Sequence, residues 1–175
     1  MTLRRFHYEQ AFEHYLRSGG IPYVAVDEAK RALQADPAGG GTATPLKSFD
    51  FVVYAEGRPN LLVDVKGRKH SGRTGRAFQN WVTRDDIDSL GRWAGIFGGG
   101  FEPCFAFLFW CDAQPPDALF LDVFAFNGRW YAVQAVTLGD YAAAMRARSA
   151  RWDTVSLPAA TFSRIVRPLN ELLRA

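Results

Sequence analysis

The chain has 175 residues, of which 48% are hydrophobic and 14% aromatic; this composition can bury a core in one domain and excludes a globally disordered protein. Twenty-one lysine and arginine residues stand against 18 aspartate and glutamate residues, so the formal net charge is +3, which permits an anionic partner without requiring one. No apolar run is long enough to span a bilayer, and no apolar stretch follows the basic first ten residues, so we expect a cytoplasmic protein without membrane association.

The first 45 residues predict a helix, a strand and a loop. A helix is expected over residues 3–17, because apolar side chains recur there at helical spacing, and Gly19-Gly20 is typical of a helix end. A short buried strand is expected over 21–26 and a short helix over 27–33. The glycine-rich segment 35–45 predicts a loop. The apolar stripe of the first helix comprises Tyr8, Ala11, Phe12, Tyr15 and Leu16.

Residues 46–100 predict a hairpin, a basic loop and a second helix. The runs 48–55 and 60–66 are typical of strands, and the EGRP turn between them predicts an antiparallel pair. A glycine-rich basic loop is expected over 67–77. An amphipathic helix is then predicted from Thr83 or Asp85 to about Phe97.

The remaining residues predict a central strand, a second hairpin and two helices. The run 104–111 is apolar without alternation, as in a strand covered on both faces. The cysteines that bound it should point to opposite faces, so no disulfide is expected. Asn127-Gly128 between two apolar runs is a strong hairpin signal, and helices are expected near 139–149 and 158–173. The order of elements predicts an α/β or α+β protein with one mixed sheet.

Three polar residues, Asp50, Asp64 and Lys66, interrupt the first predicted hairpin, although aspartate and lysine are costly to bury unpaired. Asp64 and Lys66 share a sheet face, and a turn about Gly57 would place Asp50 opposite Asp64, with Cβ atoms about 4.5–5.5 Å apart. Two carboxylates this close favour a cation between them, and Mg²⁺ takes such oxygen ligands. The alternative is a solvated sheet face on which Lys66 forms an ion pair with Asp50 or Asp64.

Glu9 on the first helix is a third candidate carboxylate. At about 100° per residue it lies beside Leu16, at the margin of the apolar stripe, and it should face the sheet. Glu13 is rotated toward water and should pair with Arg17 one turn later. For Glu9 the alternative is a solvated boundary position.

These residues resemble the PD-(D/E)xK nuclease superfamily and, within it, the archaeal-type Holliday-junction resolvase branch. The family pattern of a helix Glu, a strand Asp and Asp/Glu-x-Lys on the next strand matches Glu9, Asp50 and Asp64-Val65-Lys66. Phe49 stands where the superfamily name has proline. The opening segment also resembles uncharacterised bacterial proteins named for a His-Tyr-Glu…Ala-Phe-Glu (HYExAFE) signature.

The resemblance covers roughly residues 3–111 and implies a restriction-endonuclease-like fold, with an αβββαβ core and a mixed central sheet. Residues 1–111 would form the nuclease-like core. A C-terminal hairpin and helices, in residues 112–175, would pack on the same domain.

The resemblance further implies Mg²⁺-dependent endonuclease activity on DNA, with Mn²⁺ able to substitute. Asp50, Asp64 and the backbone carbonyl of Val65 would hold the metal, Glu9 would bind it directly or through water, and Lys66 would position the attacking water. The substrate would be branched or repair-intermediate DNA, and a homodimer is compatible with the sequence.

The basic loop after the motif strand supplies candidate contacts to DNA. Phosphate binding requires arginine and lysine beside the cleavage site, and the loop contains no acidic residue. The alternative is a solvated charged loop. The candidates are Arg68, Lys69, Arg73 and Arg76, with Gln79 at the approach to the second helix.

Other polar and aromatic residues have simpler interpretations. Asp85, Asp86 and Asp88 suit the N-terminus of a helix through its dipole. The five tryptophans are expected in the core or at an interface rather than as base-stacking platforms. Two further classes of protein stay compatible with the sequence: a catalytically silent nucleic-acid-binding or regulatory module on the same fold, and a structural or protein-interaction domain.

Overall fold

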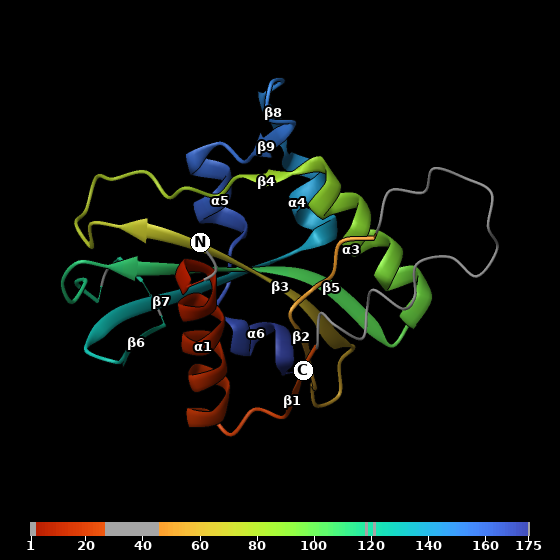
Figure 1. The fold of residues 1–175 in the computed structure, drawn as a ribbon, viewed down its shortest axis with the longest axis horizontal. Coiled ribbons are helices and arrows are strands. Elements are labelled where there is room, and N and C mark those ends of the chain that lie inside the picture. Colours follow the sequence, from red (N-terminus) through yellow and green to blue (C-terminus); the bar gives the residue numbers. More distant parts are fainter. Residues whose placement is uncertain (1–2, 27–45, 118, 121, 175) are drawn as a thin grey trace.

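A six-stranded mixed sheet forms the centre of the computed structural model, which describes residues 3–26, 46–117, 119–120 and 122–174 (Figure 1). The strand order is β1-β2-β3-β5-β7-β6. β3 and β5 are parallel, and the other neighbours are antiparallel, so the expected mixed sheet is confirmed. The strands are β1 (Tyr23–Ala25), β2 (Phe51–Val53), β3 (Asn60–His70), β5 (Phe101–Cys111), β6 (Val123–Phe126) and β7 (Arg129–Thr137).

Alternate residues of β5 enter two hydrophobic cores on opposite faces of the sheet. On one face, here called the α1 face, the sheet packs against α1 (Leu3–Ser18) and α6 (Leu169–Leu173). On the other, the α3 face, it packs against α3 (Arg84–Phe97), α4 (Leu138–Ala144) and α5 (Ala159–Ile165). Cys104 lies in the first core and Cys111 in the second, both as free thiols. The prediction of a strand covered on both faces is therefore confirmed.

Helix α1 forms and ends as its sequence predicts. Ala11, Phe12 and Leu16 are fully buried against the sheet, and Glu13 pairs with Arg17 at 3.0 Å. The Ile21 N–H donates to the Leu16 carbonyl at 2.9 Å while Gly20 adopts a φ of 63°, a left-handed conformation that suits glycine at a helix end.

Helix α3 is fixed at its start by a reciprocal cap. The Thr83 side chain accepts from the Asp86 N–H, and the Asp86 carboxylate accepts from the Thr83 N–H. The second hairpin also forms as predicted, since Asn127 and Gly128 both have positive φ, 49° and 69°, as a type I′ turn requires.

A second sheet of three short strands was not predicted. It has the order β4-β9-β8, with β4 (Val82–Thr83), β8 (Arg146–Ser149) and β9 (Thr154–Ser156). The helix expected over 139–149 therefore ends at Ala144. The strand that follows pairs with β9, and its residues, RARS, contain no apolar or β-branched run that would predict a strand.

The helix expected over 158–173 is two helices, α5 and α6. Pro168 lacks an N–H and disfavours helical conformation in the residue before it. The Arg167 backbone instead exchanges two hydrogen bonds with Ala135 of β7, at 2.8 and 2.9 Å. This break turns α6 onto the α1 face, whereas α5 packs on the α3 face.

Several predicted strand limits are wrong. β1 is an edge strand with Val24 and Ala25 exposed, rather than a buried strand, and β2 is shorter than the predicted 48–55. β3 continues to His70, so Arg68 and Lys69 belong to a strand and not to the loop, because parallel pairing with β5 extends the strand beyond the motif. The short helix expected over 27–33 and the loop over 35–45 lie outside the described residues. None of the helices in the described part of the chain is long and apolar enough to cross a membrane.

Candidate functional site

The site lies where β2 stops pairing with β3. Their register runs from Val53↔Leu61 to Phe51↔Val63, so the next position brings Asp50 opposite Asp64, as a turn about Gly57 predicts. The Asp50 N–H donates to the Val63 carbonyl at 2.9 Å, and the Asp50 carboxylate accepts from the Val65 N–H at 2.7 Å. Beyond this point β3 continues beside β5 but no longer beside β2. We call residues 64–70 of β3, where the strand has β5 but no longer β2 as a neighbour, the notch.

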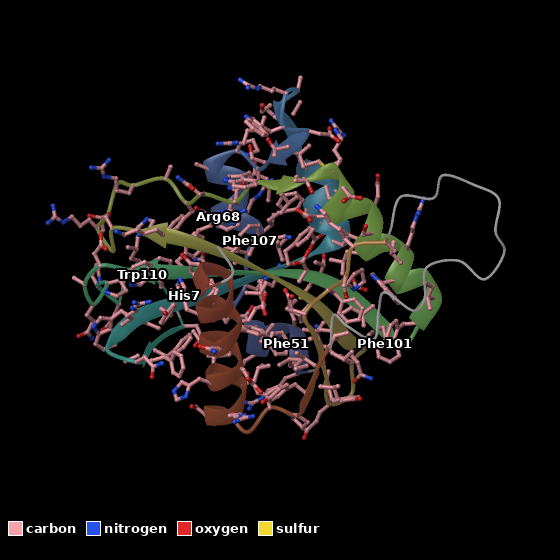
Figure 2. All side chains as sticks on the ribbon, viewed as in Figure 1. His7, Phe51, Arg68, Phe101, Phe107 and Trp110 are labelled. Atoms are coloured by element: carbon pink, nitrogen blue, oxygen red, sulfur yellow. The ribbon has the colours of Figure 1, made fainter. Side chains whose placement is uncertain are left out.

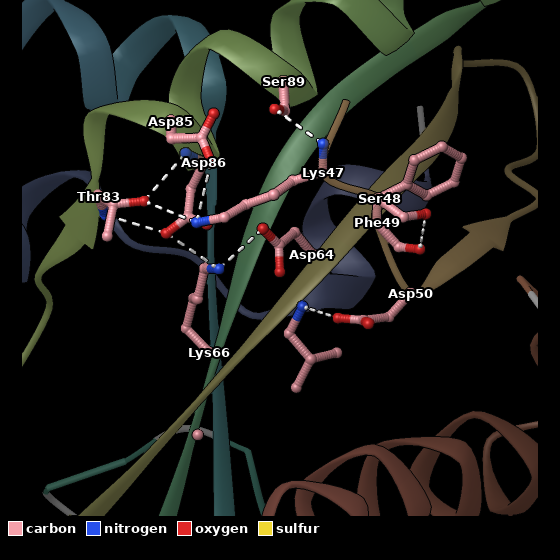
Figure 3. A network of polar contacts seen from close by, with 12 residues as sticks. Lys47, Ser48, Phe49, Asp50, Asp64, Lys66, Thr83, Asp85, Asp86 and Ser89 are labelled. Atoms are coloured by element: carbon pink, nitrogen blue, oxygen red, sulfur yellow. Dashed lines mark hydrogen bonds and ion pairs between the residues drawn. The ribbon is translucent and has the colours of Figure 1, made fainter. Parts of the chain in front are cut away.

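Asp64 and Lys66 form a buried ion pair on the α3 face of β3. Asp64 is only 5% exposed, and the Lys66 Nζ lies 2.9 Å from its Oδ2 (Figure 3). Burial raises the pKa of Asp64, the positive charge of Lys66 opposes this rise, and the negative charge of Asp50 adds to it. The net result is a pKa of about 7. The alternative of a solvated ion pair is therefore correct in pairing Lys66 with Asp64, but the pair is buried rather than exposed to solvent.

Asp86 holds Lys66 from the opposite side. The Lys66 Nζ lies 3.3 Å from Asp86 Oδ2, and the Lys47 Nζ lies 3.2 Å from Asp86 Oδ1 (Figure 3). Burial opposes ionisation of Asp86. The charges of Lys66 and Lys47 and the hydrogen bonds with Thr83 outweigh this effect and lower the pKa of Asp86 to about 2. The cap of α3 thus also fixes the ammonium group at the notch.

Sequence reasoning missed both Asp86 and Lys47. The sequence predicts Asp86 at the helix N-terminus, which is correct but incomplete, because a carboxylate has two oxygens and can both cap a helix and bind an ammonium group. Lys47 also donates to Thr83 Oγ1 at 3.2 Å and pairs with Asp85 at 3.2 Å. No local pattern marks it, since its partners are almost 40 residues away in the chain.

Glu9 lies on α1, the helix that packs on the other face of β3. Tyr8 lies against Gly67, whose missing Cβ would be 2.2 Å from the tyrosine ring. Glu9 follows Tyr8 and is half-buried. Among the residues that the structure describes, no three histidine, cysteine, aspartate or glutamate side chains are grouped closely enough to hold a metal ion. The structure thus brings together Asp50, Asp64 and Lys66 but does not add Glu9 as a third ligand.

The carboxylates at the notch fit part of a magnesium site. Asp50 and Asp64 present hard oxygen ligands from opposite positions of two strands. The charge of Asp50 also raises the pKa of Asp64, and a bound cation would relieve this repulsion. A backbone carbonyl or Glu9 would have to complete the coordination.

The predicted basic contacts divide into two groups. Arg68 is half-buried: it donates to the Gly67 carbonyl at 2.7 Å and to the Trp81 carbonyl, and its guanidinium lies 4.1 Å from the centre of the Trp81 ring. Lys69 pairs with Asp112 at 3.1 Å on the surface. Arg73, Arg76 and Gln79 are exposed in the segment between β3 and β4.

Comparison with known proteins supports the fold. No family model and no curated protein matches the sequence. Among solved structures, the chain is similar to Archaeoglobus fulgidus Hjc, a Holliday junction resolvase from an archaeal hyperthermophile, with a TM-score of 0.54 and 15% identity over 96% of this chain and 98% of that chain. The chain thus has a restriction-endonuclease-like fold, and the likeness extends well beyond residues 3–111.

Proposed function

We propose that this protein is a Mg²⁺-dependent endonuclease that hydrolyses phosphodiester bonds in branched or repair-intermediate DNA. The observation that carries the proposal is the placement of Asp50 opposite Asp64, with Lys66 beside them, where β2 leaves β3. The fold of a Holliday junction resolvase supports it.

Each residue of the site would have a distinct task. Asp50, Asp64 and the Val65 carbonyl would hold Mg²⁺ or Mn²⁺, with Glu9 reaching the site from α1. When bound, the metal would polarise the scissile phosphate and lower the pKa of the attacking water. The Lys66 ammonium, fixed between Asp64 and Asp86, would orient that water and stabilise the negative charge of the transition state.

Charge and topology support further parts of the proposal. DNA is the proposed partner. The proposed phosphate contacts are Arg73, Arg76 and Gln79, which are exposed in the segment after β3. Arg68 and Lys69 at the end of β3 are the proposed contacts nearest the site. β7 pairs with β5 in the central sheet, which favours one domain containing both 1–111 and 112–175. We further propose a cytoplasmic location and a homodimer as the form that binds branched DNA.

A catalytically silent DNA-binding module on the same fold is the second candidate. The absence of a three-ligand group among the described residues favours it. The two candidates differ in metal-dependent chemistry rather than in DNA binding.

A cleavage assay separates the two candidates. The parent protein should cut at least one of a panel of labelled four-way-junction, flap, duplex and single-stranded DNAs with Mg²⁺ or Mn²⁺, and chelator should stop it. Asp64→Ala and Lys66→Ala should each abolish cleavage while retaining cooperative unfolding and DNA binding. Binding without cleavage by the parent would support the silent module, and cleavage by either variant at the parent rate would refute the assigned site.

A further inference from the structure

The hairpin of β8 and β9 presents arginine side chains that have no acidic partner among the described residues. Arg146, Arg148 and Arg151 are all exposed, and β8 is the outer strand of the small sheet. The one carboxylate of the hairpin, Asp153, pairs with Arg84 of α3 at 3.2 Å. Within the described part of the chain, none of these three guanidinium groups is within ion-pair distance of a carboxylate.

The same hairpin exposes a tryptophan. Trp152 is 67% exposed, and the Arg151 guanidinium lies 5.2 Å from the centre of its ring. An indole of this size costs free energy when left in water, and it contributes little to the fold from this position. Aromatic rings next to arginine are the groups on which unpaired bases stack.

A stack of cations and aromatic rings connects the hairpin to the notch. Arg148 lies 5.4 Å from the centre of the Trp81 ring, whose other neighbour is Arg68 at 4.1 Å. Arg68 is two residues from Lys66 and therefore shares its sheet face. Figure 2 labels Arg68 on β3, on the side of the strand that faces the hairpin projecting at the top of the view.

The small sheet sets the distance between hairpin and site. β4 pairs with β9 through Val82↔Val155 and Thr83↔Thr154, and Thr83 caps the helix whose Asp86 holds Lys66. β8 lies two strands from β4, or about 10 Å. One strand of DNA advances about 3.4 Å per nucleotide, so the separation between β4 and β8 corresponds to roughly three nucleotides.

We propose that the β8–β9 hairpin is a second DNA-binding element, which holds a single-stranded segment next to the cleaved phosphate. Trp152 stacks on an unpaired base, and Arg146, Arg148 and Arg151 bind the phosphates on either side of it. The preferred substrate is then DNA that changes from duplex to single strand within a few nucleotides of the cut. The preference for a cut position rests on the proposed nuclease function, whereas binding by the hairpin does not.

Binding without cleavage tests the hairpin directly. Fluorescence anisotropy in chelator would compare a labelled single strand of about 12 nucleotides, a blunt duplex and a duplex with a single-stranded tail. Arg146→Ala/Arg148→Ala/Arg151→Ala should weaken binding to the tailed duplex and lower the slope of log affinity against log salt by about 2, at about 0.7 per lost phosphate contact. The control Arg17→Ala/Arg58→Ala/Arg92→Ala removes the same charge from exposed positions elsewhere and should leave the slope near that of the parent.

Trp152 is tested separately from charge. Trp152→Ala should weaken binding to the tailed duplex about tenfold and binding to the blunt duplex much less, and Trp152→Phe should restore most of the loss. Tyr54→Ala, which removes an exposed aromatic side chain directly after β2, is the control. Thermal unfolding of each variant would show whether it is folded.

Each outcome decides between the claims. Hairpin variants that bind all three DNAs like the parent would overturn the hairpin proposal and leave the proposed nuclease intact. Hairpin-dependent binding in a protein that never cleaves would support the hairpin and refute the nuclease. Tighter hairpin-dependent binding of RNA of the same sequence would overturn the assignment to DNA, and a parent that binds no nucleic acid would overturn both proposals.

Discussion

Asp86 shows how one side chain can serve both a helix and a charged site. Its carboxylate accepts from the Thr83 N–H at 2.9 Å and contacts the ammonium groups of Lys66 and Lys47. Asparagine can keep the hydrogen bond but not the charge. A substitution at this position therefore separates capping from ion pairing.

We expect Asp86→Asn to lower the free energy of unfolding at pH 7 by about 2 kcal/mol. Although burial opposes it, the surrounding cations and hydrogen bonds lower the pKa of Asp86 to about 2. A carboxyl group whose pKa is lowered by folding stabilises the protein above its unfolded pKa, and this contribution is lost as the pH falls through the folded pKa. The variant should therefore lose less stability than the parent between about pH 4 and pH 2, as measured by urea unfolding. Asp88→Asn, exposed on the same helix, is the control, and an equal effect of both changes would contradict the assignment.

Gly67 tests the packing of α1 on the notch strand. A Cβ at this position would lie 2.2 Å from the Tyr8 ring, so α1 would have to move away from β3. Gly67→Ala should destabilise the protein by about 1–3 kcal/mol and reduce cleavage by displacing Glu9, which follows Tyr8.

Gly91→Ala is the matched control for that change. Its Cβ would meet only Leu138 at 3.7 Å, and alanine favours a helix interior over glycine. Chemical denaturation should show Gly91→Ala to be as stable as the parent or more stable. If Gly67→Ala is equally well tolerated, the close approach of α1 to β3 does not matter for the site.

At the scale of elements, the end of β3 separates a cation engaged in the fold from the exposed cations that we propose to bind DNA. Arg68 is engaged by Trp81 and two backbone carbonyls, whereas Arg73 and Arg76 are exposed after the strand has ended. Arg73→Ala/Arg76→Ala should lower the salt slope of duplex binding by about 2, at about 0.9 per lost contact, without changing the unfolding midpoint. Arg68→Ala should instead lower the midpoint, because it removes packing against the Trp81 ring. A duplex titration at several salt concentrations, with thermal melts of each variant, measures both effects.

The sequence could predict the elements whose signals are local. The helical stripe of α1, the Asn127-Gly128 turn and the register that brings Asp50 opposite Asp64 depend on residues near one another in the chain. The small sheet and the partners of Lys66 could not be predicted in this way. β4 pairs with β9 through Val82↔Val155, and Lys47 meets Asp86 across 39 residues, so these contacts join segments that lie far apart in the chain.

At the scale of the whole molecule, the residues of the proposed site come from both faces of the sheet. The α3 face supplies Asp64, Lys66 and Asp86, and the α1 face carries the helix with Glu9. The notch is where β3 has lost its neighbour β2, so groups from both faces can approach one edge there. A metal ion would connect these parts only in the folded protein, and its binding should therefore appear as added stability.

Asp64→Asn tests this connection without assuming catalysis. Burial and the charge of Asp50 raise the pKa of Asp64, so above pH 7 its ionised form is held at a cost that Lys66 only partly offsets. In chelator, the variant should be at least as stable as the parent, with a gain of about 1 kcal/mol from relief of cross-strand repulsion. Metal at about a hundredfold its dissociation constant should stabilise the parent by about 3 kcal/mol and the variant by much less.

Thermal unfolding of the parent, of Asp64→Asn and of the exposed control Asp117→Asn, with chelator and with Mg²⁺ or Mn²⁺, measures both effects. Asp117→Asn should follow the parent in each condition, because its side chain is exposed on the surface. Marked destabilisation of Asp64→Asn in chelator, together with a parent that does not respond to metal, would identify Asp64 as a structural partner of Lys66. The carboxylates at the notch would then be explained by the ion-pair network with Asp86 alone, because the fold would gain nothing from a cation there.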